Sequence, residues 1–194
     1  MMNRTFFTLV VITALSAACS SPQTTTEQPT AASAGEGESA QEPAASGNRG
    51  TAEIVLGSAQ ASINYGRPEL KGRNMLSQLP DGQVWRLGMN DATRFESDSD
   101  LLFGQTLIQT GRYSIWGKKV SSDDWRLIFN SEADIWGLDR KAENDIVEIP
   151  LESSELAESV EKFTIEMNPL AEGSAEILIT WDTLQLRATF NVSE

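Results

Sequence analysis

The sequence has no histidine and a single cysteine, Cys19, among its 194 residues. Without histidine the chain lacks the commonest general base and metal ligand, which excludes His-containing catalytic triads and zinc sites built on histidine. One cysteine excludes an internal disulfide framework and a cysteine cluster site. The sequence also contains no phosphate-binding loop, dinucleotide-binding fingerprint or nucleophile elbow. We therefore assign no catalytic residue, no metal and no cofactor.

Positive charge is scarce as well, because 15 Lys and Arg residues stand against 28 Asp and Glu residues and the net charge is −13. This acidity argues against nucleic acid as a partner. Residues 50–130 hold nine basic and nine acidic residues, whereas residues 131–194 hold four basic and fifteen acidic residues. Carboxylates of the second part are therefore available to pair with cations of the first part.

The first 18 residues are expected to be a signal peptide. Met1–Arg4 is short and basic, and Phe6–Ala14 is an apolar run too short to span a bilayer. Small residues then precede Cys19, and this order resembles a bacterial lipoprotein signal whose cysteine is lipidated. The alternative is an ordinary secretory signal that is cut nearby. Lipidation of Cys19 predicts an exported protein of the cell envelope, anchored to a bacterial membrane on its periplasmic or outer surface.

Residues 19–50 are expected to be the lipidated cysteine followed by a disordered linker. The stretch is almost free of large apolar residues, so it cannot bury enough surface to offset the entropy of ordering. A flexible linker of this length spans about 30 Å, which suits a domain held away from a membrane. Residues 51–194 are expected to form one domain.

The domain shows mostly the two-residue periodicity of β-strands. Strands are expected over residues 58–65, 84–90, 113–116, 125–130, 146–151, 163–167, 177–181 and 186–192. The polar residues 118–124 predict a hairpin, residues 182–183 a turn, and residues 153–161 a short helix. Many short strands separated by turns predict an all-β fold, either an antiparallel β-sandwich or a jelly-roll-like barrel, with at most one short helix.

The stretch Tyr65–Thr93, with the adjoining Arg94, concentrates five of the Lys and Arg residues of this acidic chain. The cluster predicts either pairing with carboxylates from elsewhere in the fold or a face for an anionic ligand held by guanidinium groups. Arg67 is expected to be mainly structural. Gly88 leaves a gap that either another backbone or a small ligand fills. The candidate ligand-binding residues are Arg67, Lys71, Arg73, Arg86, Asn90 and Thr93.

Tryptophan suggests a second kind of ligand, because sugars stack on exposed aromatic rings. Trp125 and Trp181 lie in apolar alternation and are expected to be buried. Trp116 and Trp136 are the better candidates for exposure.

Several separated motifs resemble the bacterial domain-of-unknown-function family numbered 2911. They begin with Tyr65-x-Arg67-Pro68 and Lys71-Gly72-Arg73 and continue with Trp85-Arg86-x-Gly88-x-Asn90-x-Ala92-Thr93. Gly111-x-Tyr113-Ser114, Trp125 ahead of Asn130, and Trp136-Gly137 follow in order. The resemblance implies an exported or envelope protein, in keeping with the N-terminus, and it implies no particular activity.

These observations favour a non-catalytic, lipid-anchored β-sandwich that binds a small anionic or glycan-like ligand, or a partner protein of the envelope. Two alternatives stay open. One is an envelope hydrolase that uses carboxylates such as Asp91 with help from Arg86. The other is a purely structural interaction module, which would present a contiguous exposed apolar patch.

Overall fold

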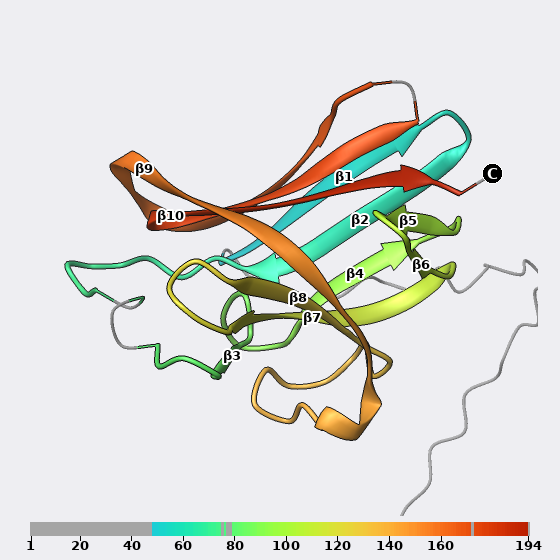
Figure 1. Ribbon diagram of the computed structural model, residues 1–194. Helices are drawn as coiled ribbons and strands as arrows, with labels where there is room; N and C mark the ends of the chain where they lie inside the picture. Colours follow the sequence, from blue (N-terminus) through green and yellow to red (C-terminus); the bar gives the residue numbers. More distant parts are fainter. Residues whose placement is uncertain (1–47, 75, 77–78, 172, 194) are drawn as a thin grey trace, which may run out of the picture. The chain divides into compact units, whose positions relative to one another are not determined.

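Two antiparallel β-sheets that share one long strand make up the fold (Figure 1). The computed structural model describes residues 48–74, 76, 79–171 and 173–193. The first sheet contains β1 (Arg49–Leu56), β2 (Ala59–Gly66), β3 (Val84–Trp85), β4 (Thr93–Ser97), β7 (Gly111–Lys119), β8 (Trp125–Asn130) and the first part of β9 (Asp145–Pro169). The second sheet contains the rest of β9, β10 (Ser174–Val192), β5 (Leu101–Phe103) and β6 (Thr106–Ile108).

This arrangement confirms the all-β prediction and decides between its two forms. The strands run in the order β1-β2-β4-β7-β8-β9-β10-β5-β6 and do not close, so the fold is a sandwich. The expected hairpin is β7 paired with β8. The expected strand over residues 84–90 ends at Trp85, because Leu87 and Asn90 have positive φ angles of 46° and 63° that leave the strand conformation.

The long strand β9 carries the chain from one sheet into the other. Up to Leu151 it pairs with β8, and from Glu152 it pairs with β10. The short helix expected over residues 153–161 is therefore wrong. The residues there favour a helix individually, but pairing along β10 satisfies the backbone and overrides that preference. A 3₁₀ turn, η2 (Ala142–Asn144), lies instead just before β9.

The turn expected at residues 182–183 is absent, because β10 continues through them and the opposite strand β9 bulges. Val160 lies opposite Asp182 and Glu155 lies opposite Leu184, so residues 156–159 of β9 face Thr183 alone. Asp182 has a φ of 53°, and its carboxylate accepts a hydrogen bond from Ser159 across the bulge. The irregularity bends the strand pair without ending it.

The core lies between the inner faces of the two sheets, where alternate side chains of each strand are buried. Its fully buried members include Ile63, Phe95, Ile115, Phe129, Phe163, Ile177 and Phe190. Burying each such side chain contributes about 1.5–3 kcal/mol. Trp125 and Trp181 are buried as expected, and Trp85 stacks on Trp181 with ring centroids 5.5 Å apart.

Candidate functional site

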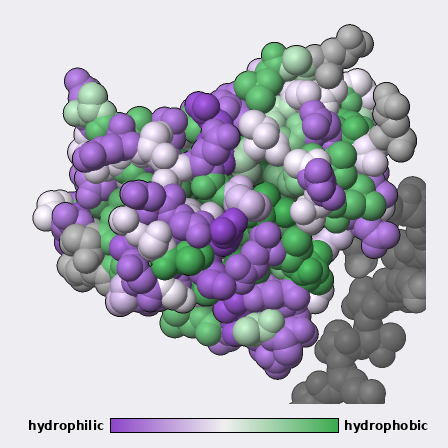
Figure 2. All heavy atoms as spheres, viewed as in Figure 1, coloured by the Kyte–Doolittle hydropathy of each residue, from purple (hydrophilic) through white to green (hydrophobic). Residues whose placement is uncertain are grey.

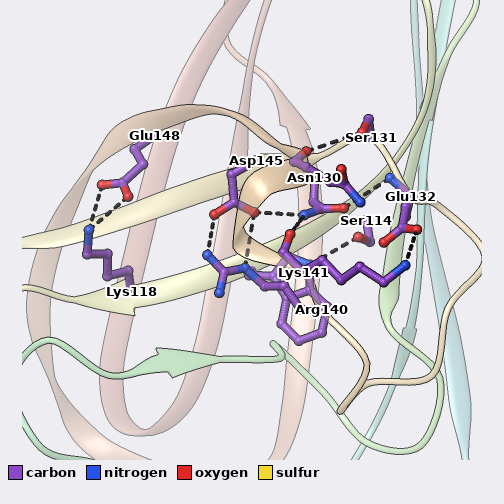
Figure 3. Close-up of polar contacts among 11 residues, drawn as sticks. Ser114, Lys118, Asn130, Ser131, Glu132, Arg140, Lys141, Asp145 and Glu148 are labelled. Atoms are coloured by element: carbon purple, nitrogen blue, oxygen red, sulfur yellow. Dashed lines mark hydrogen bonds and ion pairs between the residues drawn. The ribbon is translucent and has the colours of Figure 1, made fainter.

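A polar row crosses the outer face of the first sheet, on the side away from the core. Strand register aligns its members from β1 to β9 in the order Thr51, Asn64, Arg94, Ser114, Asn130 and Asp145. The segment 131–144, which connects β8 to β9, is anchored to the end of this row (Figure 3). The row therefore offers hydrogen-bonding partners to that segment.

Asn130 is the main anchor. Its side chain is fully buried, and its amide nitrogen donates to the Lys141 carbonyl at 2.9 Å and to Asp145 Oδ1 at 2.8 Å. Its amide oxygen accepts from the Glu132 backbone N–H at 3.0 Å. Asp145 also pairs with Arg140 (Figure 3). The buried Asn130 amide thus binds both ends of the segment. Its nitrogen and its oxygen both have hydrogen-bond partners.

On the exposed side, an ion pair joins the two ends of the segment. Lys141 Nζ lies 3.0 Å from Glu132 Oε1. The hydrogen bond from Lys141 lowers the pKa of Glu132, and the same carboxylate raises the pKa of Lys141. Both shifts favour the charged pair in the folded state.

The middle of the segment is held by apolar contacts and by backbone hydrogen bonds. Ile135 packs against a small outer-face cluster of Ala92, Trp116 and Ile128. Trp116 is only 3% exposed because the segment covers it, and its indole N–H donates to Ser114 Oγ at 3.0 Å. The expectation that Trp116 is exposed is therefore wrong. Trp136 lies 45% exposed, as expected.

Two of the sequence motifs meet along this segment. The Ala92 N–H donates to the Ile135 carbonyl at 3.0 Å, and the Gly137 N–H donates to the Asn90 carbonyl at 2.9 Å. A Cβ on residue 137 would lie 2.5 Å from the Asn90 carbonyl oxygen and 2.9 Å from Arg86 Cδ. Gly137 therefore lacks a side chain because the 86–92 stretch occupies that space.

Gly88 is also explained by a close backbone. A Cβ there would lie 3.0 Å from the Gly66 carbonyl oxygen and 3.2 Å from the Gly66 nitrogen. The φ of Gly88 is 153°, which a larger residue rarely adopts. The sequence left open whether another backbone or a small ligand fills the gap at Gly88. In the structure, the backbone of Gly66 fills it.

The six predicted ligand-binding residues fall into separate places. Thr93 is fully buried, and its hydroxyl donates to the Leu87 carbonyl at 2.5 Å. The Lys71 side chain is 72% exposed and lies 3.8 Å from Glu69. Arg73 donates back to the Leu70 and Glu69 carbonyls of its own turn, at 3.0 Å each. The structure therefore keeps Arg86 and Asn90 beside the 131–144 segment and places Lys71 and Arg73 in a different turn.

Arg67 belongs to a series of contacts along the edge of β9. Its Nε donates to the Phe163 carbonyl at 3.3 Å and its Nη2 to Thr164 Oγ1 at 3.2 Å. The Tyr65 hydroxyl donates to the Ile165 carbonyl at 3.0 Å. The Tyr65-x-Arg67 motif thus caps two alternate carbonyls on the same edge of β9. Arg67 has the structural role expected of it, with a carbonyl and a hydroxyl as its partners.

Arg86 differs from every other described cation. Each of the other Lys and Arg residues in the described ranges makes at least one hydrogen bond or ion pair, and Arg86 makes none. Its aliphatic stem packs against Gly137, and the residue is half-buried. The guanidinium group therefore keeps all five of its N–H donors unused.

A hollow of about 210 Å³ adjoins this region. The residues that line it come from the 91–94 stretch and from the 131–144 segment, and they include Asp91, Ala92, Arg94, Asp134, Ile135 and Trp136. Asp134 Oδ1 accepts a hydrogen bond from Arg112 Nη2 at 2.9 Å. Arg94 Nε lies 3.0 Å from the same oxygen as an ion pair but without the alignment of a hydrogen bond. Cations of the first part of the chain do pair here with a carboxylate of the second part.

Arg49 faces Asp91, one of the residues that line the hollow. Its side chain is 12% exposed and donates to Asn64 Oδ1 at 2.7 Å, while its Nη1 lies 3.8 Å from Asp91 Oδ2 and has no hydrogen-bond partner among the described residues. Burial lowers the pKa of Arg49, and the facing Asp91 carboxylate opposes that effect. Arg49 is therefore a buried cation whose hydrogen bonding is incomplete.

A larger hollow of about 440 Å³ lies at the bulge of β9 and β10. Two of its polar side chains have partners: Lys119 pairs with Asp81 at 3.2 Å, and Ser153 donates to the Asp123 carbonyl at 2.9 Å. Two of the three charged residues that line it, Asp123 and Glu155, are acidic, so this hollow suits an anion less well than the region around Arg86 does.

Comparison with known families matches residues 47–190 to the family described as "Protein of unknown function (DUF2911)". The chain belongs to this family. No curated protein and no solved structure matches it. Within the described ranges of this DUF2911 chain, no helix has the length and apolar character needed to cross a membrane. The same residues contain no group of three or more acidic or cysteine side chains placed to hold a metal ion.

Two charged residues of the DUF2911 domain were not singled out from the sequence: Asp134, which lines the smaller hollow, and Arg49, which faces Asp91 there. Arg49 lies in a stretch whose composition indicates a linker, but it begins β1. Asp134 is one of fifteen acidic residues in residues 131–194, and only the charge imbalance between the two parts of the chain pointed toward it. Neither residue stands in a motif, so spacing alone could not identify it.

Proposed function

We propose that this DUF2911 protein is an exported, lipid-anchored module of the cell envelope that binds a small anionic ligand through Arg86. The observation that carries the proposal is the unpartnered guanidinium group of Arg86, in an acidic chain whose other described cations have partners. The sections of the chain that would direct export lie outside the described residues, so that part of the proposal rests on sequence.

Export is supported by the order of segments before the domain. A basic start, the apolar run Phe6–Ala14 and small residues precede Cys19, and a polar linker follows. One acyl chain binds a membrane only marginally, whereas several chains anchor a protein stably. A lipidated Cys19 with its linker would hold the folded domain near a membrane and leave it free to meet ligands.

The chemistry of Arg86 supports an anion as ligand. A guanidinium group is always charged near neutral pH, and its planar donors match a carboxylate or a phosphate group in a bidentate manner. Contact with the Gly137 backbone limits the motion of the stem, so less entropy is lost when the group binds. The exposed side chain of Asn90 lies in the same stretch and adds an amide that donates and accepts hydrogen bonds.

The surface supports a small ligand over a large apolar docking patch. The exposed large hydrophobic residues come from separate elements across the described chain, and they are Val55, Leu107, Val120, Trp136, Leu138, Ile146 and Leu170. Figure 2 shows hydrophobic areas interrupted by hydrophilic residues on the face it displays. Such a surface resembles that of an ordinary soluble protein with scattered apolar residues.

The test of ligand binding compares Arg86→Ala with Arg126→Ala. Arg126, on β8, pairs with Asp124 just before that strand and serves as a matched loss of one cation. Inorganic phosphate, sulfate and a monocarboxylate are titrated by calorimetry and thermal shift. An anion at about 100 times its Kd stabilises the native state by roughly 2.7 kcal/mol. We expect Arg86→Ala to lose this effect and Arg126→Ala to keep it.

The same variants separate binding from folding. Because Arg86 has no partner, we expect Arg86→Ala to change stability without ligand by less than about 0.5 kcal/mol. A large loss of stability, together with unchanged anion binding, would refute the assignment. For the anchor, Cys19→Ala should abolish incorporation of labelled fatty acid and release the protein from membranes in a bacterial host. Retained label would refute lipidation at Cys19 while leaving the Arg86 test unaffected.

A further inference from the structure

The hollow beside Trp136 combines features that the anion proposal does not use. Its volume is about 210 Å³, below the roughly 300–1,000 Å³ of sites for drug-sized ligands, so it suits a single ring. Trp136 contributes a large aromatic surface that is 45% exposed, although the other tryptophans are buried or half-buried. A partly exposed indole beside a concave polar site offers a large apolar face to a bound ring.

The two sides of this hollow are joined by the backbone. The isolated bridge between Asp91 and Trp136 and the hydrogen bond from the Ala92 N–H to the Ile135 carbonyl connect them directly. Ile135 and Ala92 also belong to the apolar cluster beneath. The site is therefore formed before any ligand arrives, which lowers the entropy cost of binding.

The charges around the hollow balance. Three guanidinium groups face three carboxylates: Asp134 lies against Arg94 and Arg112, Arg112 also pairs with Glu96 at 3.5 Å, and Asp91 faces Arg49 at 3.8 Å. A site without net charge gains little from attracting an ion. It still presents the carboxylate acceptors of Asp91 and Asp134, whose side chains are 61% and 54% exposed. Hydroxyl groups donate hydrogen bonds to carboxylates without carrying charge, so an uncharged ligand rich in hydroxyls suits these acceptors.

We propose that this hollow binds the ring of an uncharged sugar, with one face of the ring against Trp136 and its hydroxyls hydrogen-bonded to Asp91 and Asp134. This inference goes beyond the proposed anion site, because it uses other residues and a ligand without charge. The sugar can be free in solution or part of an insoluble uncharged polysaccharide, since both present the same ring chemistry.

The test uses tryptophan fluorescence of the purified full-length protein. Acrylamide quenches mainly exposed indoles, and Trp136 is the most exposed tryptophan of the described chain. We expect uncharged mono- or disaccharides to protect the wild-type protein from quenching in a saturable manner. Trp136→Ala and Asp91→Asn should each weaken sugar binding, followed by calorimetry, by about tenfold or more. Leu138→Ala, which removes a 74% exposed side chain two residues away, should bind as wild type.

A second arm adds an insoluble uncharged polysaccharide and measures co-sedimentation. Sedimentation that Trp136→Ala abolishes indicates a polymer, and protection by soluble sugars alone indicates a free sugar. Arg86→Ala should leave sugar binding unchanged, so failure of the anion site and failure of this site are distinguishable. The proposal is overturned if no saccharide protects Trp136 and no polysaccharide retains the protein. It is equally overturned if Trp136→Ala and Asp91→Asn bind sugar as well as Leu138→Ala does.

Discussion

Replacing Tyr65 by phenylalanine removes one hydrogen bond and leaves the aromatic ring in place. The Tyr65 side chain is 3% exposed, and its hydroxyl donates to the Ile165 carbonyl on the edge of β9 at 3.0 Å. The ring packs edge-on against Phe163 with centroids 5.8 Å apart, a contact that phenylalanine keeps. The variant therefore tests the contact between the Tyr65-x-Arg67 motif and β9 in isolation.

The size of the effect follows from what the carbonyl loses. A typical hydrogen bond contributes about 0.5–1.5 kcal/mol, and a buried group left without a partner costs about 1–3 kcal/mol. Ile165 is only 2% exposed, so water cannot readily replace the hydroxyl. We expect Tyr65→Phe to lower the free energy of unfolding by about 1–3 kcal/mol, out of a total of roughly 5–15 kcal/mol for a typical domain.

Urea denaturation followed by tryptophan fluorescence measures this loss, with a fall in Tm of roughly 4 °C per kcal/mol as a second readout. Tyr113→Phe is the matched control, because the Tyr113 hydroxyl also donates to a carbonyl, that of Gln109 at 2.9 Å, but at an exposed position. Water can replace that bond, so the control should lose less than about 0.5 kcal/mol. Equal effects in the two variants would refute the view that Tyr65 caps the edge of β9.

Two further predictions concern the 131–144 segment. Gly137→Ala would place a methyl group 2.5 Å from the Asn90 carbonyl oxygen, so we expect a loss of about 1–3 kcal/mol in unfolding free energy by urea titration. A loss no larger than that of Leu138→Ala would contradict the close contact. Glu132 has a lowered pKa in the folded state because of Lys141, so its contribution to stability is present at neutral pH and disappears as the pH falls below about 5. In Glu132→Gln, the urea concentration at the midpoint of unfolding should therefore fall less between neutral and acidic pH than in the wild type. The same pH dependence in both proteins would show that the Glu132–Lys141 pair does not form in solution.

The fold was largely predictable because most strands have one buried face. Alternation over residues 58–65 and the polar turn between Trp116 and Trp125 correspond to β2 and to the β7–β8 hairpin. The prediction failed in residues 153–161, where the pattern of half-buried residues has no period of two. That part of β9 is specified by its long-range pairing with β10, and a local pattern contains no information on a partner so distant in sequence.

The candidate site was predictable only in part. Arg86 and Trp136 were selected from the sequence as a cation in an acidic chain and as an aromatic residue outside apolar alternation. Trp116 was misjudged because residues distant in sequence pack in its cluster, among them Val84 and Ile135. Whether a side chain is exposed depends on what packs over it, and that is decided between elements rather than within one.

The sequence by itself determined the fold class, and it marked a gap at Gly88 without deciding what fills it. Both are local properties, since periodicity selects strands and the absence of a side chain admits a neighbouring backbone. Only the tertiary structure decided which cations are paired. It placed Arg67 against a carbonyl of β9, joined Arg94 and Arg112 to Asp134, and left Arg86 without a partner in the described chain. Pairing depends on distances of a few ångströms between residues far apart in the chain, and these distances exist only after the two sheets have packed.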